Sequence, residues 1–370
     1  MRTPHDISVS RAMSRSMSRS TFLRSAAGAA LGGGLVLAGA GTASAAAPQV
    51  TKVRDLTGPG LTTRFRMEAT DLGIPARTPD GRILFVFGDT FEGASVGAGW
   101  WRSPVGLWST TTDLNAGVTW SGAVGGTGAA EQFWAYEHDN PVFSTVLPSD
   151  VITIGSTMYL HVMVNKGLGN VVWTEIWRSD DSGATWQHTG AKFPSDLHGG
   201  MFQMFTWGEG NDGFVYVYST GFQRDKPIIL HRVRSDRLTD LAAYEPWGWR
   251  DGVWAWGNPP TPILDGAFGE LCLRPLDGKW ILTWFNAGDY RIDGIVMDTP
   301  TSDLHTAHRQ TLIWGGAWGQ EDDSHVAQLY GGYIIPGSTL GDLHLAVSQW
   351  NTEVNWPYRV MQHRVTGLWP

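Results

Sequence analysis

The chain has 370 residues, a formal net charge of −8 and a single cysteine, Cys272, so no intramolecular disulfide can form and a large packed core must stabilise the fold. Its acidic balance, with no basic block after the first 45 residues, argues against binding to nucleic acid or to an anionic membrane surface. Its 20 tryptophans suit a packed core, and in an exported protein exposed indole faces also suit stacking on sugar rings.

Residues 1–45 have the pattern of an export signal. A basic segment, 1–24, precedes an apolar stretch from Ala26 to Ala40 and the small residues Ala43-Ser44-Ala45, an A-x-A-like cleavage site. Residues 18–24 resemble a twin-arginine box in which Ser20 replaces one arginine. A membrane anchor is the alternative, but it needs about 20 continuous apolar residues. We therefore expect a secreted or cell-wall-associated protein with no membrane attachment after cleavage, its mature chain being residues 46–370.

One pattern recurs five times in the mature chain: a turn containing glycine, followed by an apolar strand. The turns are Asp80-Gly81, Gly155-Ser156, Asp212-Gly213, Asp277-Gly278 and Gly341-Asp342, before strands expected at 83–87, 158–162, 214–218, 280–284 and 343–347. The spacing leaves room for a four-stranded antiparallel sheet in each repeat. Five such sheets arranged radially predict an all-β, single-domain, five-bladed β-propeller over residues 46–370. The segment Thr51–Leu56 is placed to close the ring as the outer strand of the last blade.

The segment Ser179–Trp186 supports a propeller independently. It fits S-x-D-x-G-x-T-W, the Asp-box of sialidase-like propellers, and residues 111–120 contain a looser version. The Asp-box is a turn on the outer strands of a blade. We therefore predict that Asp181 is a structural residue whose carboxylate caps its own backbone.

The first hairpin brings two aspartates together. If Asp80 and Gly81 are the central residues of the turn, Asp71 faces Thr90 and Asp89 faces Leu72. Asp71 and Asp89 are then diagonal neighbours on adjacent strands, with side chains within roughly 5–8 Å. Two carboxylates at this spacing are what glycoside hydrolysis requires, and either retention or inversion fits the distance. Because like charges repel, the pKa of one of them should rise, which keeps it protonated near neutral pH.

The same turn arithmetic gathers other polar and aromatic side chains on this rim. Glu270 is expected to face Phe285, Gln203 to face Phe222, and Tyr333 to face Trp350. We predict a sugar-binding cleft and name its substrate-binding candidates: Glu270, Asn286, Gln203, Tyr333, Gln349, Trp350 and Asn351. The alternative is that some of these groups are solvated loop residues or satisfy the ends of strands.

Other motifs point to function less well. Gly93–Gly97 matches the G-x-S-x-G of serine hydrolases, but no helix is expected after it. His138 with Asp139, and Glu321–Asp323 with His325, could bind a cation, although acidic loops are more often only solvated. His161 and His344 are expected to form hydrogen bonds in the core or at the rim. No zinc-binding spacing is present, so we expect neither a metal nor a cofactor.

Several segments in a fixed order resemble one known family. They are 69–73 (ATDLG), 87–91 (FGDTF), 269–271 (GEL), 330–334 (YGGYI), 348–352 (SQWNT) and 357–361 (PYRVM). Over about residues 55–365 the chain resembles the family catalogued as domain of unknown function 4185, now treated as endo-D-arabinanases of glycoside hydrolase family 183. The resemblance implies a five-bladed propeller that cleaves internal α-D-arabinofuranosyl bonds, as in arabinogalactan and lipoarabinomannan. It also implies that Asp71 and Asp89 stand on the motifs of the two essential aspartates.

Three functional hypotheses follow from the sequence. The first is a secreted hydrolase that acts within D-arabinan chains, functions as a monomer and uses Asp71 and Asp89 as general acid and as nucleophile or base. The second is a propeller that binds carbohydrate, as a lectin does, without cleaving it. The third, prompted by the Asp-box, is a sialidase-like hydrolase, which needs a cluster of arginines for the carboxylate of its substrate. For that cluster the sequence offers scattered candidates, namely Arg64, Arg66 and Arg291.

Overall fold

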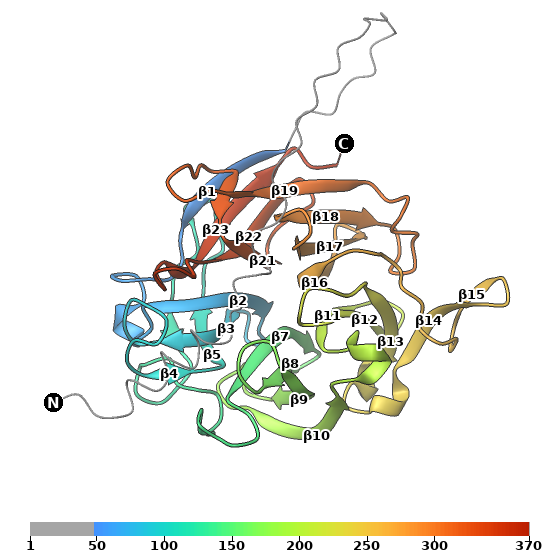
Figure 1. Cartoon of the computed structure of the whole chain (residues 1–370), viewed down its shortest axis with the longest axis horizontal. Helices are drawn as coiled ribbons and strands as arrows, with labels where there is room; N and C mark the ends of the chain where they lie inside the picture. The colour runs from blue at the N-terminus through green and yellow to red at the C-terminus, as the bar shows by residue number, and fades with distance from the viewer. Residues whose placement is uncertain (1–47, 370) are drawn as a thin grey trace, which may run out of the picture.

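Short turns divide residues 48–369, which the computed structural model describes, into five sheets arranged as a ring, antiparallel throughout except for the parallel pair β19–β20 (Figure 1). Each sheet is one blade. Four blades begin with their innermost strand, and the fifth takes its outer strand from the start of the described chain. Each innermost strand contacts the innermost strand of the next blade, and β21 of the last blade contacts β2 of the first. The molecule is therefore the five-bladed β-propeller that the sequence predicts. The export signal expected at residues 1–45 lies outside the described residues.

The blades are numbered here in chain order. Blade 1 has β2 (Ala69–Arg77), β3 (Ile83–Phe91), β4 (Trp101–Arg102), β5 (Val105–Ser109) and β6 (Gly122–Ala123). Blade 2 has β7 (Thr145–Ile154), β8 (Thr157–Asn165), β9 (Val171–Ser179) and β10 (Gln187–Pro194). Blade 3 has β11 (Met204–Glu209), β12 (Phe214–Thr220), β13 (Ile229–Arg234), β14 (Glu245–Arg250) and β15 (Val253–Trp256).

Blade 4 has β16 (Phe268–Leu276), β17 (Lys279–Asn286), β18 (Arg291–Met297), β19 (Arg309–Gly316) and β20 (His325–Ala327). Blade 5 has β21 (Leu329–Ile334), β22 (Asp342–Trp350), β23 (Tyr358–Thr366) and β1 (Gln49–Asp55). Short 3-10 turns are η1 (Thr63–Phe65), η2 (Leu114–Ala116), η3 (Leu197–Gly200), η4 (Ser235–Arg237) and η5 (Leu241–Ala243). Within residues 48–369 no helix has the length and apolarity needed to cross a membrane.

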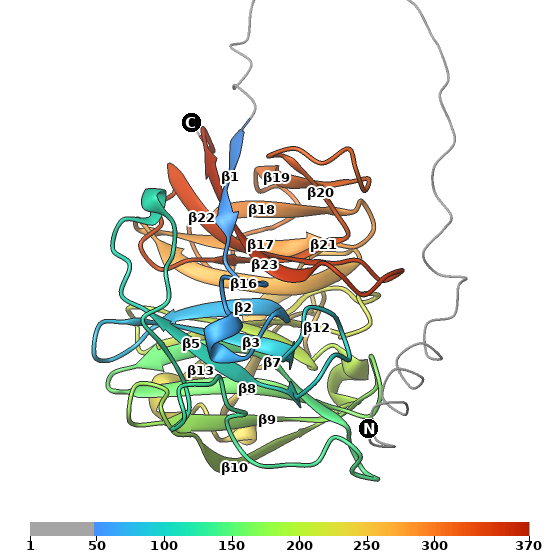
Figure 2. The ribbon, with the colours of Figure 1, turned by 90° about the vertical axis from the view of Figure 1, so that its left-hand side faces the viewer.

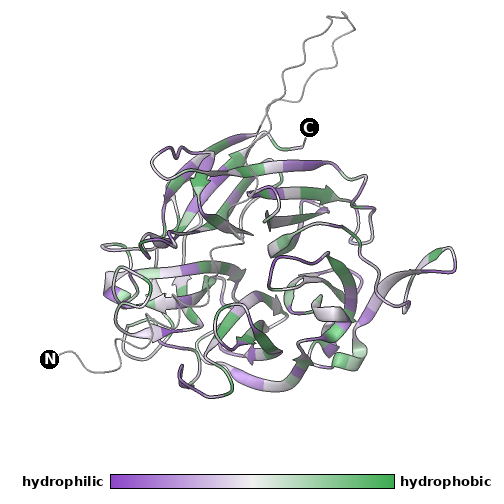
Figure 3. Ribbon diagram, viewed as in Figure 1, coloured by the Kyte–Doolittle hydropathy of each residue, from purple (hydrophilic) through white to green (hydrophobic). Residues whose placement is uncertain are grey.

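The five turn–strand repeats are confirmed, because every predicted strand lies in the second strand of a blade: β3, β8, β12, β17 or β22. All nine residues of β3 are buried, since neighbouring blades cover both faces of such a strand. The outer strand β10 instead exposes about every second residue. Figure 3 shows this difference, with β10 largely hydrophilic and the strands inside it more hydrophobic.

The ring is closed by the two ends of the described chain. Strand β1 pairs antiparallel with β23, from Gln49 opposite Thr366 to Asp55 opposite Met361. The predicted closure of the last blade by residues 51–56 is thereby confirmed. Figures 1 and 2 both show β1 beside the C-terminal end of the chain.

Turn geometry decides how accurately the sequence predicts strand pairing. Asp277 and Gly278 both have positive φ, 52° and 76°, as the tight turn requires, and Leu276 pairs with Lys279 as predicted. In the first hairpin only Gly81 has positive φ. The N–H of Thr78 donates to the carbonyl of Arg82 and closes that turn. The loop therefore has one residue more than predicted, and the strand pairing shifts by one residue.

Hairpin β14–β15 projects from blade 3 (Figure 1) and has little core of its own. Trp247 pairs across the strands with Trp256, and Trp249 pairs with Trp254, with ring centroids 4.9 Å and 5.9 Å apart. Because an isolated two-stranded hairpin is only marginally stable in water, these cross-strand aromatic pairs are its main internal contacts. Trp249 is 50% exposed even so.

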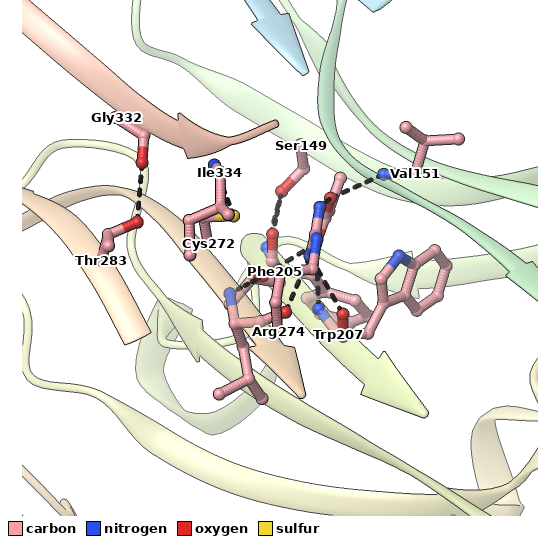
Figure 4. Close-up of polar contacts among 12 residues, drawn as sticks. Ser149, Val151, Phe205, Trp207, Cys272, Arg274, Thr283, Gly332 and Ile334 are labelled. Carbon is pink, nitrogen blue, oxygen red and sulfur yellow. Dashed lines mark hydrogen bonds and ion pairs between the residues drawn. The ribbon is translucent and has the colours of Figure 1, made fainter. Parts of the chain in front are cut away.

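A buried ion pair joins the innermost strands of three blades. Asp150 of β7 is completely buried and accepts hydrogen bonds from both terminal nitrogens of Arg274 of β16, at 2.9 and 2.7 Å. It also accepts from the hydroxyl of Thr206 (2.7 Å) and the N–H of Trp207 (3.0 Å), both on β11. Figure 4 shows Arg274 and Trp207 together at this junction. The carboxylate is fully hydrogen-bonded, so burying it is tolerated.

Hydrogen bonds of the same kind reinforce the junction of blades 2 and 3 and cross those of blades 4 and 5 and of blades 5 and 1. Ser149 on β7 bonds to the backbone of Phe205 on β11, and Thr283 on β17 donates to the carbonyl of Gly332 on β21 (Figure 4). Between blades 5 and 1, the hydroxyl of Ser348 accepts from the N–H of Leu72 at 2.8 Å. These contacts fix neighbouring innermost strands relative to one another.

We predict that Arg274→Met lowers the free energy of unfolding by about 3–5 kcal/mol, because it leaves the Asp150 carboxylate buried without its counter-charge. Urea unfolding at pH 7 measures the change. Arg232→Met is the matched control: Arg232 pairs with the half-exposed Glu245, and its loss should cost less than about 1 kcal/mol. Equal effects of the two substitutions would contradict the prediction.

Candidate functional site

One end of the ring collects acidic and aromatic side chains. Innermost strands begin at this end and second strands finish there, so Asp71 of β2, Glu270 of β16 and Tyr330 of β21 lie near strand starts, and Asp89 lies near the end of β3. We call these four residues, with Arg224 from the loop after β12, the acidic rim. The contacts described below connect them to one another.

Asp71 and Asp89 meet at a β-bulge. Thr70 pairs with Thr90 and Leu72 pairs with Phe87, so Gly88 and Asp89 together oppose Asp71. The predicted pairings of Asp71 with Thr90 and of Asp89 with Leu72 are therefore wrong, because of the longer first turn and this bulge. The aspartates are nevertheless neighbours. A Cβ atom at Gly88 would overlap Oδ1 of Asp71, so glycine is needed at that position.

The backbone beside Asp71 is strained. Leu72 has φ of 64°, in the left-handed region that a branched side chain rarely adopts, and Gly73 follows with φ of 70°. The hydrogen bond from the Leu72 N–H to Ser348 and the burial of the Leu72 side chain hold this conformation. Such strain concentrates at functional sites, and here it directs Asp71 away from the regular strand pairing.

Asp71 is partly exposed and incompletely hydrogen-bonded. The hydroxyl of Tyr330 donates to its Oδ2 at 2.8 Å, and the hydroxyl of Tyr358 lies beside the same carboxylate. Its Oδ1 is buried without a hydrogen-bond partner among the described residues. Burial, followed by the nearby charge of Asp89, raises the pKa of Asp71 to about 7, although the two tyrosines act in the opposite direction.

Asp89 is 7% exposed, and its carboxylate accepts two side-chain hydrogen bonds. Its Oδ1 accepts from the hydroxyl of Thr145 at 2.7 Å and from the indole N–H of Trp101 at 2.9 Å. Burial raises the pKa of Asp89 to about 6, while these two hydrogen bonds favour the ionised form. Trp101 is held in place by stacking on His138, with ring centroids 3.7 Å apart. The pair thus contains one carboxyl that is more easily protonated and one that is more easily ionised.

Glu270 lies on the same rim and forms an ion pair with Arg224, whose Nη2 is 2.5 Å from its Oε1. Glu270 is 7% exposed and contributes to the raised pKa of Asp71 through its charge. Among the arginines that the structure describes, Arg224 is the one that forms an ion pair with a carboxylate of the acidic rim. Arg64 instead donates to the carbonyl of Trp120, and Arg66 pairs with Glu92.

Tyr333 does not face Trp350, so this part of the prediction is wrong. It pairs with Ala346, because the N–H of Ile335 bonds to the carbonyl of His344 and the turn between β21 and β22 is longer than expected. Tyr333 is 2% exposed within the core. Tyr330, three residues earlier, is the tyrosine that contacts Asp71.

The four predicted substrate-binding amides form hydrogen bonds within the protein. Asn286 caps the turn that follows β17, and Asn351 caps the turn that follows β22. Gln349 is completely buried and bonds to residues of blades 4 and 5. Gln203 joins the carbonyl of Ser195 to the N–H of Phe222, and so supports the loop that carries Arg224.

Trp350 lies behind the rim and packs edge-on against Tyr358, with ring centroids 5.5 Å apart. Because Tyr358 is beside the carboxylate of Asp71, Trp350 can influence the site through that tyrosine. Sequence reasoning placed neither Tyr330 nor Tyr358 in the site, although both stand in the family-like segments. Thr145, Trp101 and Arg224 carried no comparable sequence signal.

Two other residues that the sequence analysis discussed, Asp181 and His161, form no contact with the acidic rim. Asp181 is confirmed as a turn residue: its carboxylate accepts from the N–H of Thr185 at 2.9 Å, and hydrogen bonding lowers its pKa. His161 is completely buried, stacks on Phe205 at 3.8 Å and has no hydrogen-bond partner among residues 48–369, so its expected hydrogen bond is wrong. Within that range, no group of three or more acidic, histidine or cysteine side chains is arranged to hold a metal.

A family comparison agrees with this architecture. The profile of the family described as domain of unknown function (DUF4185) matches residues 57–364. The chain belongs to the DUF4185 family. It is 32% identical over 325 residues to the uncharacterized 35.9 kDa protein in the asd 3′ region of Mycolicibacterium smegmatis, an alignment that covers 83% of this chain and 95% of that protein.

Two solved structures have a similar fold. One is described as a candidate hydrolase from Bacteroides ovatus, with a TM-score of 0.59, 16% identity, and coverage of 86% of this chain and 90% of that chain. The other is an exo-β-1,3-galactanase from Phanerochaete chrysosporium bound to β-1,3-galactotriose, with a TM-score of 0.52, 7% identity, and coverage of 86% and 64%. At these identities the likeness concerns the fold. This DUF4185 member thus shares a propeller fold with glycoside hydrolases.

We predict that Thr145→Val raises the pKa of Asp89 by about one to two pH units. The substitution removes a hydrogen bond to the ionised carboxylate, worth about 1.5–3 kcal/mol, and 1.36 kcal/mol corresponds to about one pH unit. A ¹³C NMR titration of the carboxyl groups measures it. The control is Thr283→Val, another buried threonine, whose hydroxyl bonds to the carbonyl of Gly332. An unchanged pKa of Asp89 in Thr145→Val would refute the role given to this hydroxyl.

Proposed function

We propose that this DUF4185 member is a secreted, monomeric glycoside hydrolase that cleaves internal α-D-arabinofuranosyl bonds of D-arabinan with Asp71 and Asp89. The observation that carries the proposal is the pairing of two carboxyls at a strained bulge, where Oδ1 of Asp71 has no hydrogen-bond donor within residues 48–369. A structural carboxylate in this propeller, such as Asp150, is instead fully bonded. The propeller fold shared with glycoside hydrolases supports the reaction class, and the segment resemblance supports the substrate.

The reaction follows from the two carboxyl environments. Asp71, with the higher pKa, holds a proton near neutral pH and donates it to the glycosidic oxygen as the bond from that oxygen to the anomeric carbon breaks. Asp89, ionised and held by Thr145 and Trp101, either bonds to the anomeric carbon itself or takes a proton from the water that attacks it. The two courses give opposite anomers of the first product, which ¹H NMR distinguishes.

We predict that Asp71→Asn and Asp89→Asn each reduce the release of reducing ends from D-arabinan at least 10³-fold. Asp181→Asn, in the Asp-box remote from the rim, should retain activity. If the wild-type protein binds D-arabinan and releases no ends, the lectin alternative replaces the hydrolase. A sialidase-like reaction is disfavoured because Arg291 pairs with Asp289 and Asp293 and not with a residue of the acidic rim.

Stability shows whether the inactive variants are folded. The pKa of Asp71 in the folded protein is raised from 3.8 to about 7, so the folded state loses stability relative to the unfolded state as pH rises from about 4 to about 7, and the loss stays constant above that range. Because asparagine cannot ionise, the Tm of Asp71→Asn relative to wild type should rise between pH 5 and pH 8.

We predict a bell-shaped pH profile with its maximum between about pH 6 and pH 7. Activity should fall below this range as Asp89 is protonated, and above it as Asp71 loses its proton. Initial rates at low substrate concentration, which report kcat/KM, measure both limbs. The acid limb should move to higher pH in Thr145→Val, and a profile that is flat from pH 5 to pH 8 would exclude the assignment.

A further inference from the structure

Arg224 reaches the acidic rim from the loop between β12 and β13. Its side chain is 31% exposed, whereas that of its partner Glu270 is 8% exposed, so the arginine is the member of the pair that faces solvent. The loop is fixed below it, because Gln203 accepts from the N–H of Phe222 at 3.1 Å. Arg224 is therefore a positioned side chain on the rim, and its guanidinium is open to a ligand.

The guanidinium lies beside Tyr330, the residue that bonds to Asp71. Its central carbon is 5.0 Å from the ring centroid of Phe285 and 5.4 Å from that of Tyr330. The hydroxyl of Tyr330 bonds to Asp71 on its other side. A Cβ atom at Gly269 would lie 2.7 Å from Phe285 and 3.2 Å from Nε of Arg224, so glycine provides the room for this packing.

Within residues 48–369, most of the side-chain donors of Arg224 have no acceptor. Across residues 48–369, the hydrogen bond that it donates runs from Nη2 to Oε1 of Glu270. A guanidinium has five N–H groups in a planar fork, and a free one binds a carboxylate through two parallel hydrogen bonds. With Glu270 in place the pair has no net charge, and Asp89 adds a negative charge beside Asp71 on the same rim. An anionic sugar would meet repulsion here, whereas neutral hydroxyls can accept from the remaining donors.

We propose that Arg224 binds hydroxyl groups of the sugar next to the bond that is cut, and that Glu270, by neutralising Arg224, makes the rim select uncharged sugars over uronic acids. The inference rests on the proposed function, because it places a glycan at this rim. It adds that the rim selects uncharged sugars, and it names Glu270 as the residue responsible for this selection.

The test measures binding by calorimetry in an Asp71→Asn background, which stops turnover and leaves that position uncharged, as in the protonated acid. Two probes are used: a neutral oligosaccharide from D-arabinan and the anionic trisaccharide trigalacturonate. Glu270→Gln frees Arg224 and should increase affinity for trigalacturonate at least tenfold. The gain should shrink in 0.5 M NaCl and disappear when Arg224→Met is added. Arg224→Met alone should weaken binding of the neutral probe about tenfold.

Glu270→Asp is the matched control, since it keeps the charge and loses one methylene, and it should bind trigalacturonate no better than the background protein. Arg232→Met, in an exposed ion pair, should change neither affinity. If folded Glu270→Gln gains no affinity for trigalacturonate, or if Glu270→Asp gains as much, the inference is overturned. The two proposals can also fail separately. If Glu270→Gln gains affinity for trigalacturonate only when Arg224 is present, the role of Glu270 is upheld. If the same protein neither binds nor cleaves D-arabinan, the proposed substrate is refuted.

Discussion

The ion pair between Asp150 and Arg274 is the interaction about which the propeller is assembled. It ties β7 to β16 across β11, and its carboxylate accepts five hydrogen bonds, including one from the N–H of Val151. Apolar packing between blades is non-directional and leaves their relative rotation loosely defined. Directional contacts at the innermost strands fix that rotation, and with it the positions of side chains that come from different blades.

The acidic rim also depends on this rigidity. There, however, a carboxyl group is held with fewer hydrogen bonds than Asp150 receives. Asp71 comes from blade 1, its tyrosine partners come from blade 5, and Asp89 is bonded by Thr145 of blade 2. Each of these side chains is held by a well-packed strand, so Asp71 can be kept with an oxygen that accepts no hydrogen bond from the described part of the chain. The raised pKa values and the left-handed Leu72 are costs in stability that the surrounding blades offset.

Local patterns in the sequence were enough to predict the fold and to predict that Asp71 and Asp89 are neighbours. Turn glycines marked all five second strands, because a tight turn constrains φ at neighbouring residues. The exact pairing of the two strands that flank Asp80 was not predictable. One added loop residue and a bulge shift their register, and neither changes the pattern of hydrophobic residues in the sequence. For the same reason Tyr333 was placed on the rim in place of Tyr330. Arg224 was missed because its contact with Glu270 joins positions 46 residues apart in different blades.

The composition of blade 5 has a consequence for how the molecule is made. Its outer strand, β1, is the first described strand of the chain, while its other three strands are the last. During synthesis, residues 49–55 must therefore remain without their partner until the C-terminal strands emerge, after the other four blades have been translated. Closure of the ring is thus a late folding event, and a chain without β1 or without β23 would leave blade 5 incomplete.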